Sequence, residues 1–190
     1  ELKAKGITPC LAVIQVGNDP ASCVYVNNKK KACAYIGIES LSYELDENIS
    51  QEELLTIIDE LNHNEMVNGI LVQLPLPKHI DEDAVIATIS PEKDVDGFSP
   101  VSVGKMMLGQ DTYLPCTPFG VMKLLEHSGI DVAGKHAVIV GRSHIVGKPM
   151  GQLLLQKDAT VTYTHSKTPD LPSFTKQADI LIAAVGRENF

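Results

Sequence analysis

The sequence contains no tryptophan, few other aromatic residues and no long uninterrupted run of apolar side chains. A membrane-spanning helix needs about 18 consecutive apolar residues, and no stretch of the chain approaches that length. No basic segment followed by an apolar one opens the chain, as a secretory leader would. We therefore expect a cytoplasmic protein that does not act in a membrane.

Cysteine is also sparse. Cys10, Cys23, Cys33 and Cys116 form neither a CxxC pair nor the spacing of a metal-ligand set. We therefore expect reduced structural thiols, with no disulfide framework and no bound metal.

Basic residues are outnumbered, with 16 Lys and Arg against 24 Asp and Glu and a formal net charge of −8. Nucleic acids and anionic membranes bind basic faces, so neither is an expected partner. An anionic ligand must instead find a local positive site. Otherwise the composition, 44% hydrophobic and 21% charged, is that of a globular protein with one large or two small domains.

The first half of the chain alternates between strand-like and helix-like patterns. Asp19 and Pro20 mark the start of the first helix and Gly37 its end. Ser50 and Glu53 have the spacing of a capping box. The expected strands are residues 10–16, 38–45 and 70–74, and the expected helices are residues 20–36, 51–61 and 81–89.

Residues 90–118 are rich in Pro, Gly and Asp and are expected to form a long loop that ends at a domain boundary near Cys116. A helix then begins at Thr117-Pro118 and ends at Gly129, and a second strand–helix–strand series follows, typical of one mononucleotide-binding half. The sequence therefore predicts an α/β protein with two three-layer α/β domains, residues 1–116 and 117–190.

Both ends of the chain interrupt a pattern. "ELKAKG" reads as the tail of a helix, and the second series stops after its third strand, whereas doubly wound sheets normally have more. We expect a fragment of a longer protein, with the first domain incomplete at its start and the second truncated at its end.

"GRSHIVGKP" lies between an apolar strand and a helix, where backbone N–H groups and the helix dipole favour a phosphate. Gly141 permits a tight exit from the strand, and Gly147 lets the helix approach closely. The glycine spacing departs from GxGxxG, and a simple turn is the alternative. A position at the carboxyl end of a parallel strand favours nucleotide binding.

The end of the next strand reads "THSKT", with His165, Ser166 and Lys167 but no acid to hold a ribose 2′-hydroxyl. The planar guanidinium group of Arg142 could bind a 2′-phosphate. NADP is therefore preferred over NAD, and the second domain is predicted to be Rossmann-like and NADP-binding. The alternative is that Arg142 and Lys167 are solvated surface cations.

Ser22, Tyr25 and Lys29 lie at i, i+3 and i+7 of the first predicted helix and so share one face. A lysine beside a tyrosine hydroxyl in a cleft is suited to proton transfer. Residues 29–31 are also a run of three lysines, which is typical of a solvated helix face.

Gln73 ends a buried strand, where an amide side chain must either cap the next loop or bind a ligand or catalytic group. "KDVDGF" supplies Asp94 and Asp96. Asp96-Gly97 is a common turn sequence, but a carboxylate there could also accept two N–H bonds from a ring with an amino-amide edge.

Five motifs, in this order, resemble the bifunctional methylenetetrahydrofolate dehydrogenase/cyclohydrolase family: "SCVYVNNKKKAC", "GILVQLPLP", "PEKDVDGF", "LPCTP" and "GRSHIVGKPM". The resemblance runs from about Val16 to Gly186 and includes the unusual glycine spacing. It implies NADP-dependent oxidation of 5,10-methylenetetrahydrofolate and hydrolysis of the methenyl product to 10-formyltetrahydrofolate, in one-carbon metabolism. It also implies a homodimer.

The resemblance implies a role for each matching residue. Lys29 would transfer protons, Tyr25 would stack on the folate and bond Lys29, Gln73 would position Lys29, Asp96 would anchor the pterin and Ser22 would assist. Leu74 and Pro75 would complete the substrate site. The residues implied at the cofactor are Thr117, Gly141, Arg142, Ser143, Ile145, Val146, Gly147, His165, Ser166, Val185 and Gly186.

Two other functions fit the sequence. The protein could be an NAD-linked dehydrogenase without the hydrolase step. It could also be a nucleotide-binding fragment without catalysis, since its second sheet reads as incomplete.

Overall fold

The computed structural model describes residues 2–187, which form two compact units, residues 2–95 and 96–187. Each unit has its own three-stranded parallel sheet. The expected α/β class is therefore confirmed. The contacts divide the chain at Val95 and Asp96, upstream of the boundary expected near Cys116.

The sheet of the first unit has the order β2-β1-β3. β1 (Cys10–Val16) is central and pairs in parallel with β2 (Glu39–Leu45) and β3 (Gly69–Val72). Six of the seven β1 residues are buried, because this strand is covered on both faces. That burial explains why its sequence is a nearly continuous apolar run.

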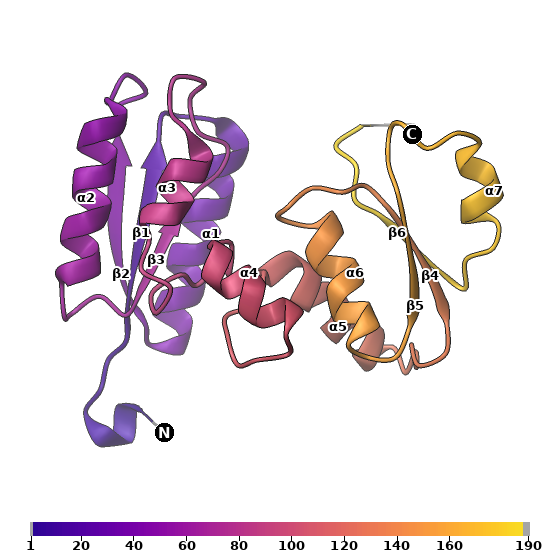
Figure 1. Ribbon diagram of the computed structural model, residues 1–190. Coiled ribbons are helices and arrows are strands. Elements are labelled where there is room, and N and C mark those ends of the chain that lie inside the picture. Colours follow the sequence, from indigo (N-terminus) through magenta and orange to yellow (C-terminus); the bar gives the residue numbers. More distant parts are fainter. Residues whose placement is uncertain (1, 188–190) are drawn as a thin grey trace. The chain divides into compact units, whose positions relative to one another are not determined.

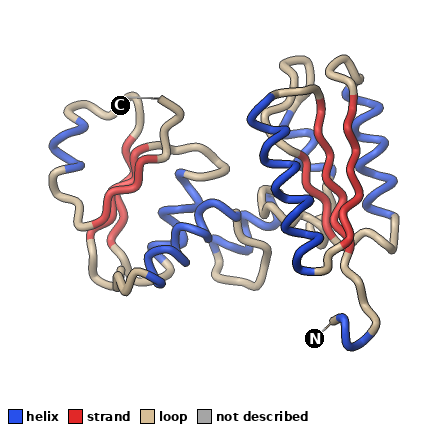
Figure 2. Tube along the Cα trace, turned by 180° about the vertical axis from the view of Figure 1, so that it is seen from behind, coloured by secondary structure: helices blue, strands red, loops and turns tan. Residues whose placement is uncertain are grey.

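Helices cover both faces of this sheet (Figures 1 and 2). α1 (Pro20–Ile36) packs on one face through Val26, which meets Val13 and Leu71. α2 (Gln51–His63) and α3 (Glu82–Thr88) cover the other face and enclose the larger core. The first unit is thus a three-layer α/β structure, as predicted.

The helix ends follow the sequence signals. The Asp19 carboxylate accepts a hydrogen bond from the Ser22 N–H at 2.8 Å, and Gly37 ends α1 in the left-handed conformation at φ 81°. Ser50 and Glu53 form the expected capping box at the start of α2. These caps satisfy backbone groups that a helix end leaves unpaired, and they confirm both predicted ends of α1 and the predicted start of α2. α2 continues to His63, two residues beyond its expected end.

The sheet of the second unit has the order β5-β4-β6, again parallel with the first strand at its centre. β4 (His136–Val140) lies between β5 (Thr160–Thr164) and β6 (Ile180–Ala183). α5 (Cys116–His127) and α6 (Gly147–Leu155) pack on one face and α7 (Leu171–Thr175) lies on the other (Figure 1).

One helix lies where the sequence predicted a loop. α4 (Pro100–Met107) begins after Ser99, whose side chain caps the Ser102 N–H. It packs against α6, where Gln152 donates to the Met107 carbonyl at 3.4 Å. This packing places residues 100–107 in the second unit. At the other end of the chain, the expected helix tail is a 3₁₀ turn, η1 (Lys3–Lys5).

Cys10 and Cys33 are buried, and no disulfide joins the four cysteines, all of which lie in the described range. No helix within residues 2–187 combines the length and apolarity needed to cross a bilayer. Over the same residues, no three His, Cys, Asp or Glu side chains gather in a group that would hold a metal ion.

Candidate active site

Both sheets change direction at their first strand. The chain crosses from β1 to β2 on one side and returns to β3 on the other, and β4, β5 and β6 repeat this order. Open parallel sheets bind ligands at the carboxyl ends of strands, at the point where the strand order reverses. The candidate residues of each unit follow these strand ends.

Lys29 and Gln73 meet in the first unit. The Lys29 ammonium donates to the Gln73 side-chain oxygen at 3.3 Å, although 44 positions separate them in sequence. The Gln73 amide nitrogen donates to the Leu74 carbonyl at 2.8 Å, and the Gln73 backbone N–H donates to the Ile14 carbonyl in β1. The glutamine therefore has a fixed orientation and directs its oxygen toward the lysine.

Ser22 and Tyr25 lie on the same helix as Lys29 but in different environments. Ser22 is 5% exposed, whereas Tyr25 is 62% exposed and its ring is accessible to a ligand. The expected bond between Tyr25 and Lys29 is not formed among the described residues, because the ammonium is directed toward Gln73. Leu74 is half-buried and Pro75 is exposed.

The start of α1 is held by a charged cap. The pKa of the Asp19 carboxyl is lowered because it accepts hydrogen bonds from the backbone and side chain of Ser22. The cap fixes the first turn of the helix that carries Tyr25 and Lys29.

Asp96 lies in a turn directly after a segment that is anchored to the first unit. The Lys93 carbonyl accepts a hydrogen bond from Ile70 in β3 at 2.8 Å. The Lys93 ammonium donates to the carbonyls of Leu61 at 3.0 Å and Asn64 at 2.8 Å, at the end of α2. Asp96 itself is half-buried.

A pocket of about 210 Å³ lies at the carboxyl ends of β4, β5 and β6 in the second unit. Six of the residues implied at the cofactor line it: Gly141, Arg142, His165, Ser166, Val185 and Gly186. Sequence reasoning missed Val140 and Arg187, which line the pocket as well. The signal for Arg187 was its place directly after the Val185-Gly186 turn.

The two glycines of the turn have the expected steric roles. Gly141 has a φ of 125°, and a Cβ there would lie 2.2 Å from the Ala184 carbonyl oxygen. A Cβ on Gly147 would lie 2.6 Å from the Gly141 carbonyl oxygen. Both contacts are with backbone, so any other residue would force the strand ends and the helix start apart.

The start of α6 differs from the expectation. Backbone N–H groups were expected to face the ligand, but the Ser143 hydroxyl oxygen accepts hydrogen bonds from Val146 and Gly147, each at 3.2 Å. The Lys148 N–H donates to the Ser143 carbonyl at 3.0 Å. These three N–H groups are therefore satisfied within the turn.

The remaining residues implied at the cofactor do not line this pocket. Thr117 is exposed in the first turn of α5. Ile145 is 38% exposed in the turn before α6, and Val146 and Gly147 begin that helix. Lys167 also lies outside the pocket, and its N–H donates to the His165 ring at 3.1 Å.

Comparison with known proteins identifies both units. Residues 1–96 match the catalytic domain of tetrahydrofolate dehydrogenase/cyclohydrolase, and residues 115–190 match the NAD(P)-binding domain of the same proteins. The bifunctional protein FolD of Lysinibacillus sphaericus is 77% identical over 189 residues, which cover 100% of this chain and 66% of that protein.

Two solved structures are also similar. The FolD methylenetetrahydrofolate dehydrogenase/cyclohydrolase of Campylobacter jejuni has a TM-score of 0.94 and 56% identity, over 97% of this chain and 66% of that one. The Trypanosoma brucei enzyme, complexed with NADP and an inhibitor, has a TM-score of 0.92 and 41% identity, over 97% and 64%. This chain thus spans about two thirds of the length of these relatives.

Proposed function

The chain belongs to the tetrahydrofolate dehydrogenase/cyclohydrolase family, and from this we propose that the intact protein oxidises 5,10-methylenetetrahydrofolate with NADP and hydrolyses the 5,10-methenyl product to 10-formyltetrahydrofolate. The observation that carries the proposal within this chain is the contact between Lys29 and Gln73, at the carboxyl edge of the first sheet.

The residues of the second unit fit a phosphorylated dinucleotide. The pocket holds two arginines, and its glycine turn lets the backbone of β4 and α6 approach closely. NADP, when bound, accepts the hydride that the methylene carbon of the substrate gives up. The task of the chain in this step is to hold the two reacting carbons face to face.

Hydrolysis requires a side chain that transfers protons. Water must attack the methenyl carbon, lose a proton and open a C–N bond, so a group is needed that takes up and returns protons. Lys29 is the proposed group, because Gln73 directs its amine and helix α1 holds it at the sheet edge. The exposed Tyr25 ring offers a stacking surface for the folate, and Asp96 and Ser22 are proposed to bind its polar edge.

The test is Lys29→Met in the intact protein, with Lys31→Met as the matched control from the same lysine run. We expect Lys29→Met to lower the rate of methenyl hydrolysis by at least about a hundredfold, the scale of a general acid–base group. Lys31 is exposed and its replacement should leave both rates unchanged. Hydrolysis that persists in Lys29→Met would remove Lys29 from this role.

The two alternatives make different predictions. Equal or faster oxidation with NAD than with NADP, together with absent methenyl hydrolysis, would support the NAD-linked dehydrogenase. Calorimetric binding of NADP without binding of a folate analogue would support a nucleotide-binding module. A homodimer in the cytoplasm is part of the main proposal, and sedimentation of the intact protein tests the dimer.

A further inference from the structure

Arg187 was not expected at the cofactor site, yet it lines the same pocket as Arg142. The two arginines come from different strand ends. Arg142 follows Gly141 at the end of β4, and Arg187 follows the turn after β6. The pocket therefore brings together side chains that are 45 positions apart, counted as 187 − 142.

The strand ends that precede the two arginines are joined. The Ala184 N–H donates to the Val140 carbonyl at 2.8 Å, which ties the end of β6 to the end of β4. The Ala184 carbonyl lies so close to Gly141 that a Cβ would meet it at 2.2 Å. Arg142 follows Val140 by two residues and Arg187 follows Ala184 by three, so both arginines leave the sheet at neighbouring strand ends.

Among the residues that the structure describes, the ionisable groups that line the pocket are Arg142, His165 and Arg187, all of them basic. The described lining residues include no carboxylate, although the chain as a whole carries a net charge of −8. A guanidinium group carries a positive charge and presents its N–H donors in a planar fork that matches the oxygens of a phosphate. A phosphate bound in this pocket could therefore accept charged, bidentate hydrogen bonds of the kind that arginine forms.

We propose that Arg187 is a second phosphate-binding side chain of this pocket, acting with Arg142 on a phosphate group of the dinucleotide. The inference rests on the proposed function, which supplies the dinucleotide. Its phosphate is either the 2′-phosphate or the pyrophosphate, and the two are separated by the choice of ligand in the test.

The experiment measures dissociation constants of NADP and NAD for the intact protein by calorimetry. The variants are Arg187→Gln, Arg187→Lys and Arg142→Gln. Arg187→Gln should weaken NADP binding about ten- to hundredfold, the range for loss of a charged hydrogen bond. The affinity of Arg187→Lys for NADP should lie between those of the wild type and Arg187→Gln, because lysine keeps the positive charge but lacks the planar guanidinium group.

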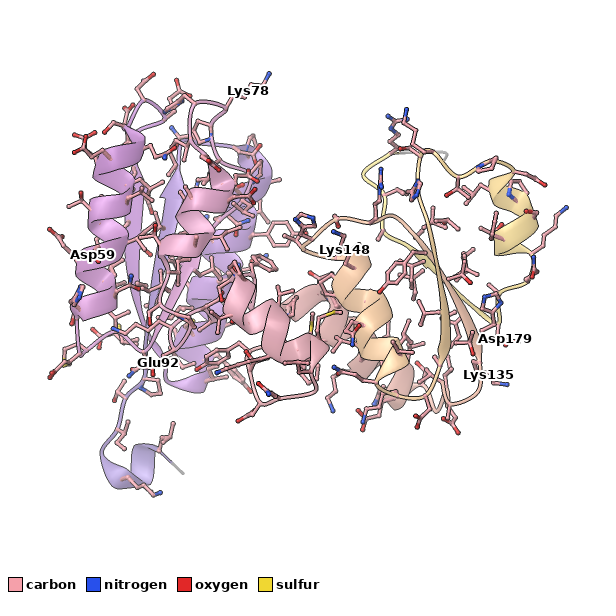
Figure 3. All side chains as sticks on the ribbon, viewed as in Figure 1. Asp59, Lys78, Glu92, Lys135, Lys148 and Asp179 are labelled. Carbon is pink, nitrogen blue, oxygen red and sulfur yellow. The ribbon has the colours of Figure 1, made fainter. Side chains whose placement is uncertain are left out.

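Lys135→Gln is the matched control, because it removes the same charge from the same unit. Lys135 is exposed and immediately precedes β4, so it lies at the amino end of the sheet, opposite the pocket. Figure 3 shows it beside Asp179, which immediately precedes β6. This variant should bind NADP as the wild type does.

The outcomes separate the two phosphates. Weaker binding of NADP with unchanged NAD places Arg187 at the 2′-phosphate, and equal weakening of both places it at the pyrophosphate. Binding of 2′,5′-ADP and of 5′-ADP provides the same comparison without the nicotinamide. Each of these results supports the inference.

The inference is overturned if Arg187→Gln weakens NADP binding no more than Lys135→Gln does. If Arg142→Gln weakens NADP binding and Arg187→Gln does not, only the role of Arg187 fails. If the wild type binds neither dinucleotide, the proposed function fails and the inference fails with it.

Discussion

At the scale of single residues, backbone contacts restrict side-chain size around the turn at the end of β4. The φ angle at position 147 does not require glycine. Glycine is needed there because a Cβ atom would have no space. A Cβ would lie 2.6 Å from the Gly141 carbonyl oxygen and 2.9 Å from the Arg142 nitrogen. Because these atoms belong to the backbone, they cannot move aside by changing a rotamer.

Gly147→Ala should therefore lower the free energy of unfolding by about 1–3 kcal/mol, the usual cost of forcing extra volume into a packed site. Gly104→Ala is the control. Gly104 also lies in a helix of the second unit, α4, but a Cβ there meets nothing within 4 Å. That change should be neutral or stabilising because alanine favours helix. Urea unfolding measures both, and equal stabilities for the two variants would contradict the steric account.

A single carboxylate also makes stability depend on pH. The pKa of Asp19 is lowered in the folded protein by its hydrogen bonds to Ser22. The cap therefore stabilises the fold fully above the ordinary aspartate pKa, and this stabilisation is lost as the pH falls through the lowered folded value. The loss lies below about pH 4, the ordinary range of an aspartate.

Asp19→Asn keeps an oxygen acceptor but cannot titrate. We expect the difference in melting temperature between wild type and Asp19→Asn to shrink as the pH is lowered from 7 toward 3. Thermal melts across that range measure it. A difference that stays constant with pH would show that the Asp19 charge makes no contribution.

At the scale of elements, one lysine joins three segments of the first unit. The Lys93 ammonium binds the Leu61 and Asn64 carbonyls at the end of α2, and its own carbonyl binds Ile70 in β3. Asn62 in α2 supports the same region, because its side chain bonds Thr88 and Ser90 on either side of the end of α3. A cation at a helix C-terminus is also favoured by the helix dipole.

Lys93→Met should lower the free energy of unfolding of the intact protein by about 1–2 kcal/mol, because two carbonyls lose a charged donor. Lys78→Met is the control from the same unit, since Figure 3 shows Lys78 extending into solvent. Chemical denaturation compares the two. If Lys93→Met lowers the free energy of unfolding no more than Lys78→Met does, water must satisfy the two carbonyls as well as the Lys93 ammonium does.

At the scale of the whole molecule, the two units repeat one plan. Each has a three-stranded parallel sheet with its first strand at the centre, and the candidate residues follow the strand ends. The strongly negative net charge is compatible with an anionic cofactor because both described arginines of the second unit, together with His165, line one pocket. Placement of cations therefore matters more for this site than the overall charge.

Much of this fold could be predicted from the sequence because the signals are local. The apolar run of β1, the caps of α1 and the capping box of α2 each depend on residues only a few positions apart. α4 was missed because it lies in a stretch rich in Pro, Gly and Asp, which was expected to form a loop, and because its packing against α6 is not visible in the sequence. Its Ser99-Pro100 start was the one local signal.

The sequence by itself determined where the strands lie, the ends of α1, the start of α2, the glycine turn and the family motifs, because each depends on residues that are close together in the chain. Only the tertiary structure decided that the Lys29 ammonium bonds Gln73 and not Tyr25, that the Ser143 hydroxyl accepts hydrogen bonds from the N–H groups of its own turn and that Arg187 lines the same pocket as Arg142. The physical reason is the order of strands in each sheet. That order brings distant strand ends together, and short-range patterns along the chain do not encode it.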